Sequence, residues 1–355
     1  MRARQPDRDG HVEHDGVKIG YEVFGHGTPT LLLLPTWTIV HSRFWKMQVP
    51  YLADHYRVVT FDRPGNGRAD RPTDREAYES DAAVAQALAV MDATETDRAV
   101  LVSESAGAQD TLRLAAEHAD RVLAAVFIGN SLRIEKGHPE FDKALSRFTE
   151  PYPDPPDGWE RFNAKYWFDH YDDFTRFFFS QCFPEPHSTK QQDDAVGWAA
   201  ETGPEAIFAH IASFVSGDRA REWAARVTVP TLVIHGDDDR ISPVSRAVTL
   251  AGMLDSELVV LEGSGHLPLA RDPVRVNLLI REFVDRVAPS PTPEPRRWNR
   301  SVRRRRRALF VSSPIGLGHA RRDVAIAEEL RRHHPDLEID WLAQHPVTRM
   351  LEETG

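Results

Sequence analysis

The stretch Ala99-Val100-Leu101-Val102-Ser103-Glu104-Ser105-Ala106-Gly107 decides the fold class of this chain. It joins a continuous apolar run, typical of a buried strand, to a helix-like segment from Gln109 to His118. A serine on such a sharp turn has a strained backbone, and neighbouring chain passes close to the positions two before and two after it, where only small side chains fit. Gly107 meets this requirement, and Ser103 stands where glycine is usual. The stretch therefore predicts that Ser105 is a nucleophile.

Apolar runs and helix-like segments alternate on both sides of this turn. The runs are mostly unbroken by polar residues, as in strands that are buried on both faces. Such alternation predicts a parallel, doubly wound α/β sheet. The predicted strands are Val17–Phe24, Thr30–Pro35, Arg57–Phe61, Ala99–Val102, Val122–Ile128, Thr231–His235 and Leu258–Leu261, and the predicted helices are Ser42–His55, Ser80–Ala93, Gln109–His118, Ser245–Leu254 and Pro273–Val287.

The alternation stops over residues 134–228, which are helix-like and rich in aromatic side chains. An insertion at this place in a doubly wound sheet predicts a helical lid over the carboxyl edge of the strands, where such sheets place their sites. The aromatic side chains have two interpretations, a pocket for an acyl or aromatic group and the lid's own core. Trp37, Trp167 and Phe178 are the candidates for substrate contact, and the lone Cys182 is interpreted as a small buried hydrophobic residue.

Two later loops carry the groups that a serine nucleophile needs. A serine hydroxyl requires a base within hydrogen-bond reach and a third group that orients the base. His235-Gly236-Asp237-Asp238-Asp239 follows one predicted strand, and Gly263-Ser264-Gly265-His266 follows the next. Because both loops lie at strand carboxyl ends, the serine, one of the aspartates and the second histidine can converge. His41 and His235 are interpreted as structural or solvent-facing residues.

These residues resemble the α/β-hydrolase superfamily, in its branch of carboxylesterase-like and methyl-ester-hydrolase-like members. The resemblance covers roughly residues 12–288. It implies that Ser105 is the nucleophile, that His266 is the base, and that the acid lies three residues after the glycine of the strand-end motif. That acid is Asp239, with Asp238 as the fallback.

The same resemblance implies an oxyanion hole made of two backbone amides. Such a hole binds the negative charge that develops on the carbonyl oxygen. One donor is the amide of Ala106, directly after the nucleophile. The other comes from the loop after the predicted strand Thr30–Pro35. The family usually has His-Gly there, whereas this chain reads Pro35-Thr36-Trp37-Thr38, which puts the second donor at Trp37. The segment Asp62–Asp70 is also similar to the turn that follows the fourth strand in this family.

The implied function is hydrolysis of a carboxylic ester, less readily of a thioester or an amide. The expected partner is a small-molecule ester with an apolar acyl or aromatic part, and no cofactor or metal is expected. Because the oxyanion loop departs from the family pattern, an alternative is a ligand sensor that keeps the three residues but turns over slowly. A third hypothesis is the front end of a bifunctional hydrolase–glycosyltransferase.

Composition limits the other classes of function. The chain has 355 residues and a net charge of −10, which does not favour nucleic acid as the main partner. One cysteine allows no internal disulfide and favours a reducing compartment. The N-terminal residues 1–16 lack the apolar stretch of a signal peptide, and no apolar run is long enough for a bilayer. We therefore expect a cytoplasmic protein without membrane contact.

The C-terminal part differs from the rest. A linker over residues 289–307 is rich in proline and ends in eight arginines, five of them consecutive, interpreted as solvated rather than phosphate-binding. Phe310-Val311-Ser312-Ser313-Pro314-Ile315-Gly316-Leu317-Gly318-His319 then resembles the first strand–loop–helix of two-lobed glycosyltransferases, which predicts an incomplete Rossmann-like βαβ segment. The predicted parts are thus a hydrolase core (1–133 and 229–288), a lid (134–228), a linker (289–307) and a partial glycosyltransferase-like segment (308–355).

Overall fold

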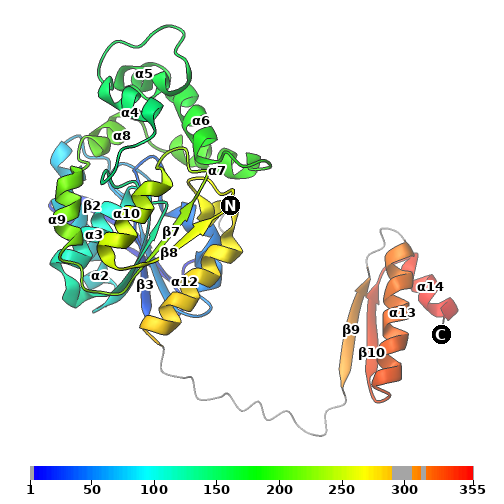
Figure 1. Cartoon of the computed structure of the whole chain (residues 1–355). Coiled ribbons are helices and arrows are strands. Elements are labelled where there is room, and N and C mark those ends of the chain that lie inside the picture. Colours follow the sequence, from blue (N-terminus) through cyan, green and yellow to red (C-terminus); the bar gives the residue numbers. More distant parts are fainter. Residues whose placement is uncertain (1–3, 290–305, 313–316, 355) are drawn as a thin grey trace. The chain divides into compact units, whose positions relative to one another are not determined.

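The computed structural model describes residues 4–289, 306–312 and 317–354. The chain divides into two compact units, Met1–Thr292 and Pro293–Gly355 (Figure 1). Most of the predicted linker lies outside the described residues, and so does the part of the predicted glycine loop from Ser313 to Gly316.

The larger unit is built on one eight-stranded sheet with the order β1-β2-β4-β3-β5-β6-β7-β8. The pairs β1–β2 and β2–β4 are antiparallel, and all other neighbouring pairs are parallel. This order places β5, which leads into Ser105, in the middle of the sheet. The strands are β1 (Arg8–His14), β2 (Val17–Phe24), β3 (Thr30–Leu33), β4 (Arg57–Phe61), β5 (Ala99–Glu104), β6 (Val122–Ile128), β7 (Thr231–Gly236) and β8 (Glu257–Leu261).

The central strands are buried on both faces, as their unbroken apolar sequence predicts. Along β3, Leu31 and Leu33 belong to one hydrophobic core, whereas Leu32 belongs to the other. Residues of α1 and α12 complete the first core, and residues of α2, α3 and α10 complete the second. The helices of these layers are η1 (Ser42–Met47), α1 (Val49–Leu52), η2 (Arg75–Tyr78), α2 (Ser80–Ala93), α3 (Gly107–Glu117), η3 (Ala119–Arg121), α10 (Val244–Leu254), α11 (Pro268–Arg271) and α12 (Pro273–Val287).

Two local predictions differ from the structure. The predicted single helix Ser42–His55 is wrong, because the 3-10 helix η1 is followed by the separate short helix α1. Pro50 lies in the first turn of α1, where its missing N–H is not needed, whereas within a continuous helix it would break the hydrogen-bond ladder. No strand is predicted over Arg8–His14. This segment forms β1, a polar strand at the end of the sheet order, and its sequence contains no apolar run that would indicate a buried strand.

A series of helices lies between β6 and β7. Most of them gather at one end of the sheet, where α4, α5, α6 and α8 lie together (Figure 1). The last one, α9, instead packs against α3 and α10, and its Trp223 is buried in the second core. The inserted helices are α4 (Pro139–Ser146), η4 (Gly158–Arg161), α5 (Ala164–Asp169), α6 (Tyr171–Cys182), α7 (Thr189–Ala199), α8 (Pro204–Ile211) and α9 (Gly217–Ala224).

The smaller unit contains a two-stranded parallel sheet. β9 (Arg307–Ser312) pairs with β10 (Glu338–Ala343), and α13 (Leu317–His333) connects the two strands. α13 packs against β9 and against the final helix α14 (Val347–Thr354). Parallel neighbours need such a crossover connection, and a helix is its usual form.

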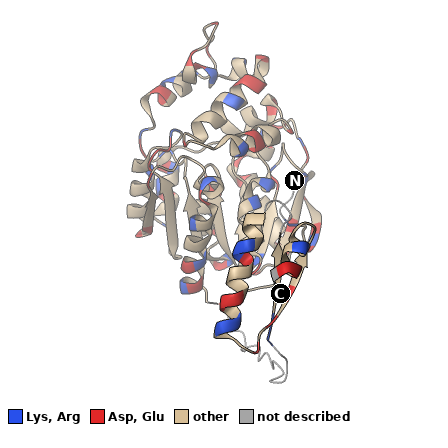
Figure 2. Ribbon diagram, turned by 90° about the vertical axis from the view of Figure 1, so that its right-hand side faces the viewer, with Lys and Arg blue, Asp and Glu red and all other residues tan. Residues whose placement is uncertain are grey.

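Acidic and basic residues are interspersed along the helices (Figure 2). Over the described residues, none of the helices combines the length and the apolar character needed to cross a membrane.

Candidate active site

Ser105 stands on the turn between β5 and α3 with a φ of 49°, in the left-handed region that residues other than glycine rarely adopt. A backbone held in this region costs on the order of 1–3 kcal/mol and persists only where the surrounding structure imposes it. A Cβ at Gly107 would lie 2.6 Å from the carbonyl oxygen of Pro35, so a larger residue does not fit there. Ser103 is accommodated in the other small-residue position because its buried hydroxyl donates to the carbonyl of Val126 over 3.3 Å.

Three side chains from separate strand ends meet beside this turn. His266, in the loop after β8, has its Nε2 atom 2.9 Å from the Oγ atom of Ser105. The other ring nitrogen, Nδ1, lies 2.7 Å from the Oδ2 atom of Asp239, in the loop after β7. His266 and Asp239 are each only 3% exposed, so water does not compete for this hydrogen bond. The arrangement lets the imidazole accept the serine proton at Nε2 while Asp239 holds the Nδ1 proton.

The structure brings Asp239, and not the fallback Asp238, to the histidine. The Oδ1 atom of Asp239 accepts hydrogen bonds from the amides of Ile241 and Ser242, at 2.8 and 2.9 Å, which fix the carboxylate. Asp238 is exposed, and its nearest cationic partner is Arg240 at 3.7 Å. The turn after β7 therefore directs one aspartate inward and the preceding one to the surface.

His235 is a further neighbour of the acid. It is fully buried at the end of β7, and its Nε2 atom lies 2.8 Å from the carbonyl of Ser242 and 3.2 Å from the Oδ2 atom of Asp239. His41, for which the sequence left the same two interpretations as for His235, is also buried, with its Nε2 atom 3.4 Å from the Oε1 atom of Glu201. Neither contacts Ser105.

Burial and neighbouring charges set the pKa values of Asp239 and His266. Burial by itself acts to raise the pKa of Asp239, but the charges and hydrogen bonds of His266 and His235 hold this pKa well below its usual range. Burial acts to lower the pKa of His266, whereas the charge and hydrogen bond of Asp239, with the charge of Glu104, raise it overall. Asp239 is therefore ionised, and the imidazolium formed when His266 takes up a proton is stabilised.

A second buried carboxyl group, Glu104, faces the same histidine and was not among the predicted site residues. Its Oε1 atom lies 3.4 Å from Nε2 of His266 and has no hydrogen-bond partner among the described residues. Burial raises the pKa of Glu104 to about 7, while the charge of His266 and a hydrogen bond from the side chain of Thr36 act in the opposite direction. Its position directly before Ser105 is the signal in the sequence that could have identified it.

The two predicted oxyanion donors lie on parts of the chain that touch. Gly107, which follows Ala106, lies against the carbonyl of Pro35, so the turn approaches the loop that carries Trp37. Ser105, Ala106 and Trp37 line the same cavity. Within the described parts of the chain, neither the Ala106 amide nor the Trp37 amide has a hydrogen-bond acceptor. Both remain available for a ligand oxygen.

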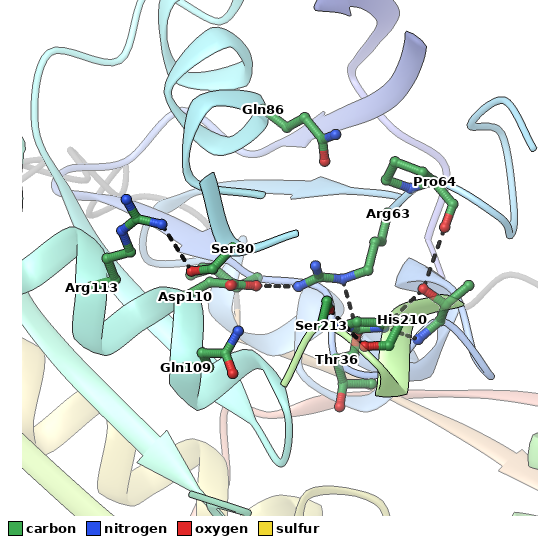
Figure 3. Close-up of polar contacts among 12 residues, drawn as sticks. Thr36, Arg63, Pro64, Ser80, Gln86, Gln109, Asp110, Arg113, His210 and Ser213 are labelled. Carbon is green, nitrogen blue, oxygen red and sulfur yellow. Dashed lines mark hydrogen bonds and ion pairs between the residues drawn. The ribbon is translucent and has the colours of Figure 1, made fainter. Parts of the chain in front are cut away.

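The loop that carries Trp37 is fixed on both sides by buried groups (Figure 3). The carbonyl of Thr36 accepts a hydrogen bond from Nε of Arg63 over 3.3 Å, and the Arg63 guanidinium is paired with the buried carboxylate of Asp110. On the other side, the amide of Thr38 donates to Nδ1 of His210 over 3.0 Å. The departure from the usual His-Gly sequence therefore leaves a loop with defined anchors.

His210 was not predicted, because it lies in α8, 172 residues from Thr38. It is 2% exposed. Burial lowers the pKa of His210 well below its usual value, and the charge of Arg63 acts in the same direction. A neutral ring leaves Nδ1 free to accept the Thr38 proton, which is the role that the geometry requires.

Two cavities meet at Ser105. The first has a volume of about 250 Å³ and is lined by Ser105, Glu104 and His266, with mostly apolar residues from η1, α6 and α7 around them. The second has a volume of about 210 Å³ and is lined by Ser105 and Ala106, with several charged residues farther out, among them Arg246.

Trp37 and Phe178 line both cavities. Their rings meet edge to face with centroids 5.3 Å apart. Trp167, the other aromatic residue predicted to contact substrate, lines neither cavity. It is fully buried with its ring centroid 5.6 Å from that of Trp37, so it packs behind the wall of the site. Cys182 is 1% exposed, and burial raises its pKa well above the usual value.

A metal site does not emerge from the described residues, where no group of three or more His, Cys, Asp or Glu side chains could hold an ion.

Comparison with known proteins places this fold in a family. Residues 29–273 match the family model described as alpha/beta hydrolase fold. This match covers more than half of the chain, and the chain belongs to the α/β-hydrolase family.

Proteins similar to this chain include a hydrolase-superfamily protein, a haloperoxidase and an esterase. The AB hydrolase superfamily protein YisY of Bacillus subtilis (strain 168) is 27% identical over 275 residues, which are 75% of this chain and 95% of the relative. The non-heme haloperoxidase of Rhodococcus erythropolis is 28% identical over 290 residues, which are 76% of this chain and 97% of the relative. The crystal structure of the esterase RhEst1 from Rhodococcus sp. ECU1013 aligns with a TM-score of 0.64 and 25% identity, over 79% of this chain and 98% of that one.

Proposed function

We propose that the chain is a serine hydrolase that cleaves a carboxylic ester through an acyl-enzyme. The observation that carries this proposal is the continuous hydrogen-bonded line from Ser105 through His266 to Asp239, with distances of 2.9 and 2.7 Å. The serine of this line opens onto two cavities, which is what a substrate with two parts on either side of a carbonyl requires.

In the first step, Ser105 Oγ attacks the ester carbonyl while His266 Nε2 takes up the serine proton. Asp239 stabilises the imidazolium, and the amides of Trp37 and Ala106 donate to the oxyanion. Removing one such donor typically slows turnover by about 100- to 1,000-fold. The C–O bond to the alcohol then breaks, and His266 gives its proton to the leaving oxygen. The acyl group remains on Ser105 as an ester.

In the second step, water replaces the alcohol beside His266. The imidazole accepts a proton from this water as its oxygen attacks the acyl-enzyme carbonyl. Collapse of the second oxyanion breaks the bond to Ser105, and His266 returns the proton to the serine oxygen. The products are one carboxylic acid and one alcohol, and the enzyme is restored without a cofactor. Helices α4–α8 would act as the lid that shields these steps from bulk water.

The test is the hydrolysis of short acyl p-nitrophenyl esters by the wild type and two serine variants. Ser105→Ala is expected to abolish turnover. Ser103→Ala, which removes a buried hydroxyl two residues away, is the matched control and is expected to retain most of the activity. Undiminished hydrolysis by Ser105→Ala would exclude Ser105 as the nucleophile. A wild type that binds esters tightly but turns over negligibly would favour the ligand-sensor alternative.

For the smaller unit, we propose that it corresponds to the first strand–helix–strand of a glycosyltransferase-like lobe. The parallel β9–β10 pair with α13 between its strands supports this reading. The coding sequence beyond Gly355 tests it. A continuous frame that encodes a second lobe would support a bifunctional hydrolase–glycosyltransferase, and an immediate stop codon with no further open frame would argue for a degenerate remnant.

A further inference from the structure

The second cavity contains a buried cation that makes no ion pair with a described carboxylate, although the charge of Asp142 in the same cavity acts on it. Arg246, near the start of α10, lines this cavity and is 5% exposed. Its Nε atom donates to the backbone carbonyl of Glu135 over 3.1 Å, but no carboxylate of the described residues lies within ion-pair distance of its guanidinium. Burial lowers the pKa of Arg246 and outweighs the charges of Asp142, Asp239 and Glu135, which act to raise it, so the buried charge is only partly compensated. A bound anion would compensate it further.

A second guanidinium lies in the same cavity. Arg133 is more exposed than Arg246, and its guanidinium carbon lies 5.6 Å from the ring centroid of Phe214. Arg133 makes no hydrogen bond or ion pair with any other described side chain. The charges of Arg133 and Arg246 repel one another, since Arg133 acts to lower the pKa of Arg246 further. The charge of Asp142 acts to raise the pKa of both guanidinium groups, and two guanidinium groups that share this one carboxylate favour a further anion beside them.

The acidic residues of this cavity are already engaged. One carboxylate oxygen of Asp142 accepts the amide proton of Gly137 over 2.9 Å. Glu135 accepts a hydrogen bond from Thr249 over 3.2 Å and lies 3.8 Å from Arg221, outside the cavity. Lys136 adds a third positive charge to the lining. The cavity wall therefore carries three cations against two carboxylates, of which Glu135 has other partners and Asp142 offsets part of the charge of Arg246 and Arg133.

The position of His266 assigns the two cavities to the two sides of the scissile bond. The histidine must protonate the leaving oxygen, so the alcohol has to lie on the side of its Nε2 atom. His266 lines the first, apolar cavity and not the second. The acyl group is then directed past Ala106 into the second cavity, toward Arg246 and Arg133.

We propose that the substrate is an ester whose acyl group carries its own carboxylate, which Arg246 and Arg133 bind in the second cavity, while an apolar alcohol occupies the first. This assignment rests on the proposed ester hydrolysis and names its substrate class. The substrate is thus a monoester of a dicarboxylic acid, and the products are the free dicarboxylic acid and an uncharged alcohol.

The experiment compares p-nitrophenyl monoesters of dicarboxylic acids of increasing chain length with the matching esters in which the free carboxylate is a carboxamide. Each pair has the same leaving group and nearly the same shape, so the ratio of their kcat/KM values isolates the charge. A hydrogen-bonded charge pair of this kind predicts a preference for the carboxylate of about 10- to 100-fold at the best chain length.

Three variants localise the effect. Arg246→Gln is expected to reduce the preference to less than about threefold, and Arg133→Gln, at the more exposed guanidinium, to reduce it partly. Arg147→Gln is the matched control, because Arg147 follows α4 in the same inserted segment but lines another cavity, and it is expected to leave the ratio unchanged. The ratio does not depend on how much of a variant is folded, so a partial loss of stability in Arg246→Gln does not obscure the result.

The outcomes separate the two proposals. Hydrolysis of neutral esters with equal or faster turnover of the carboxamides would overturn the carboxylate site and leave the ester hydrolase intact. A preference that persists in Arg246→Gln and Arg133→Gln would place the carboxylate elsewhere and also overturn it. Failure to hydrolyse any ester would overturn the proposed function together with the substrate class derived from it.

Discussion

Replacing Arg63 by methionine is expected to lower the free energy of unfolding by about 3–5 kcal/mol, the range found when one partner of a buried ion pair is removed. The side chains of Arg63 and Asp110 are 4% and 5% exposed, so the variant leaves a carboxylate that is neither hydrated nor paired (Figure 3). It also removes the donor to the carbonyl of Thr36, which adds about 1 kcal/mol.

The double variant Arg63→Met/Asp110→Leu separates these contributions. It removes the isolated carboxylate, and only the unsatisfied Thr36 carbonyl remains, so we expect a cost of about 1–2 kcal/mol. Arg113→Met is the matched control on α3, because Arg113 pairs with Asp81 and Glu117 near the surface. Exposed pairs contribute about 1 kcal/mol or less.

Urea unfolding followed by tryptophan fluorescence measures the stability of all three variants. Steady-state kinetics add a second readout. Without the hydrogen bond from Arg63, the Thr36 carbonyl can move and displace the adjacent Trp37 amide. We propose that this amide acts only on the oxyanion. Arg63→Met is therefore expected to lower kcat about tenfold or more with little change in KM. Equal stability of the single and double variants, or an Arg63→Met variant as active as the wild type, would refute this reasoning.

Three further predictions concern the charges of the site. Asp239→Asn should lower kcat by about 10,000-fold with KM nearly unchanged, because the histidine loses the partner that fixes its tautomer; a loss below tenfold in ester hydrolysis would argue against Asp239 as the acid. Glu104→Gln removes a charge that raises the pKa of His266, so the acid limb of the kcat/KM profile should move to lower pH, and an unmoved or upward-shifted limb would contradict this. His210 has a depressed pKa when folded, so the unfolded state takes up its proton first, and stability should fall as pH drops below about 6.5. The urea midpoint of His210→Gln should depend less on pH between 6.5 and 5 than that of the wild type, and identical pH dependences would exclude this contribution.

The sequence predicts the central sheet well because local signals determine it. Unbroken apolar runs such as Leu31–Leu34 and Val122–Ile128 identify strands that are buried on both faces, and small residues around Ser105 identify the turn between β5 and α3. Polar alternation at the edge of the sheet gives no such signal, so the sequence does not reveal β1 (Arg8–His14).

The residues around the site were harder to predict because distant contacts give them their roles. Glu104 could be an ordinary strand residue until the fold places His266 3.4 Å away. His210 and Arg246 lie in helices far along the chain from the segments that they contact. Trp167 is a residue that the sequence predicted at the site but that packs behind its wall. An aromatic residue in the inserted helices is compatible with a substrate pocket and with a core, and only its packing in the structure distinguishes these interpretations.

Detection of an acyl group on Ser105 tests the central claim most directly. The wild type is mixed with a p-nitrophenyl monoester, quenched within the first turnover, and analysed by intact mass and peptide mapping. We predict a rapid release of one p-nitrophenol per active site and a mass increase equal to the acyl group on the peptide that contains Ser105. Steady hydrolysis without a burst would mean that acylation is the slower step, and the acyl group would then be sought on Ser105 by trapping. An acyl group on a different residue, or hydrolysis that persists in Ser105→Ala, would contradict the account.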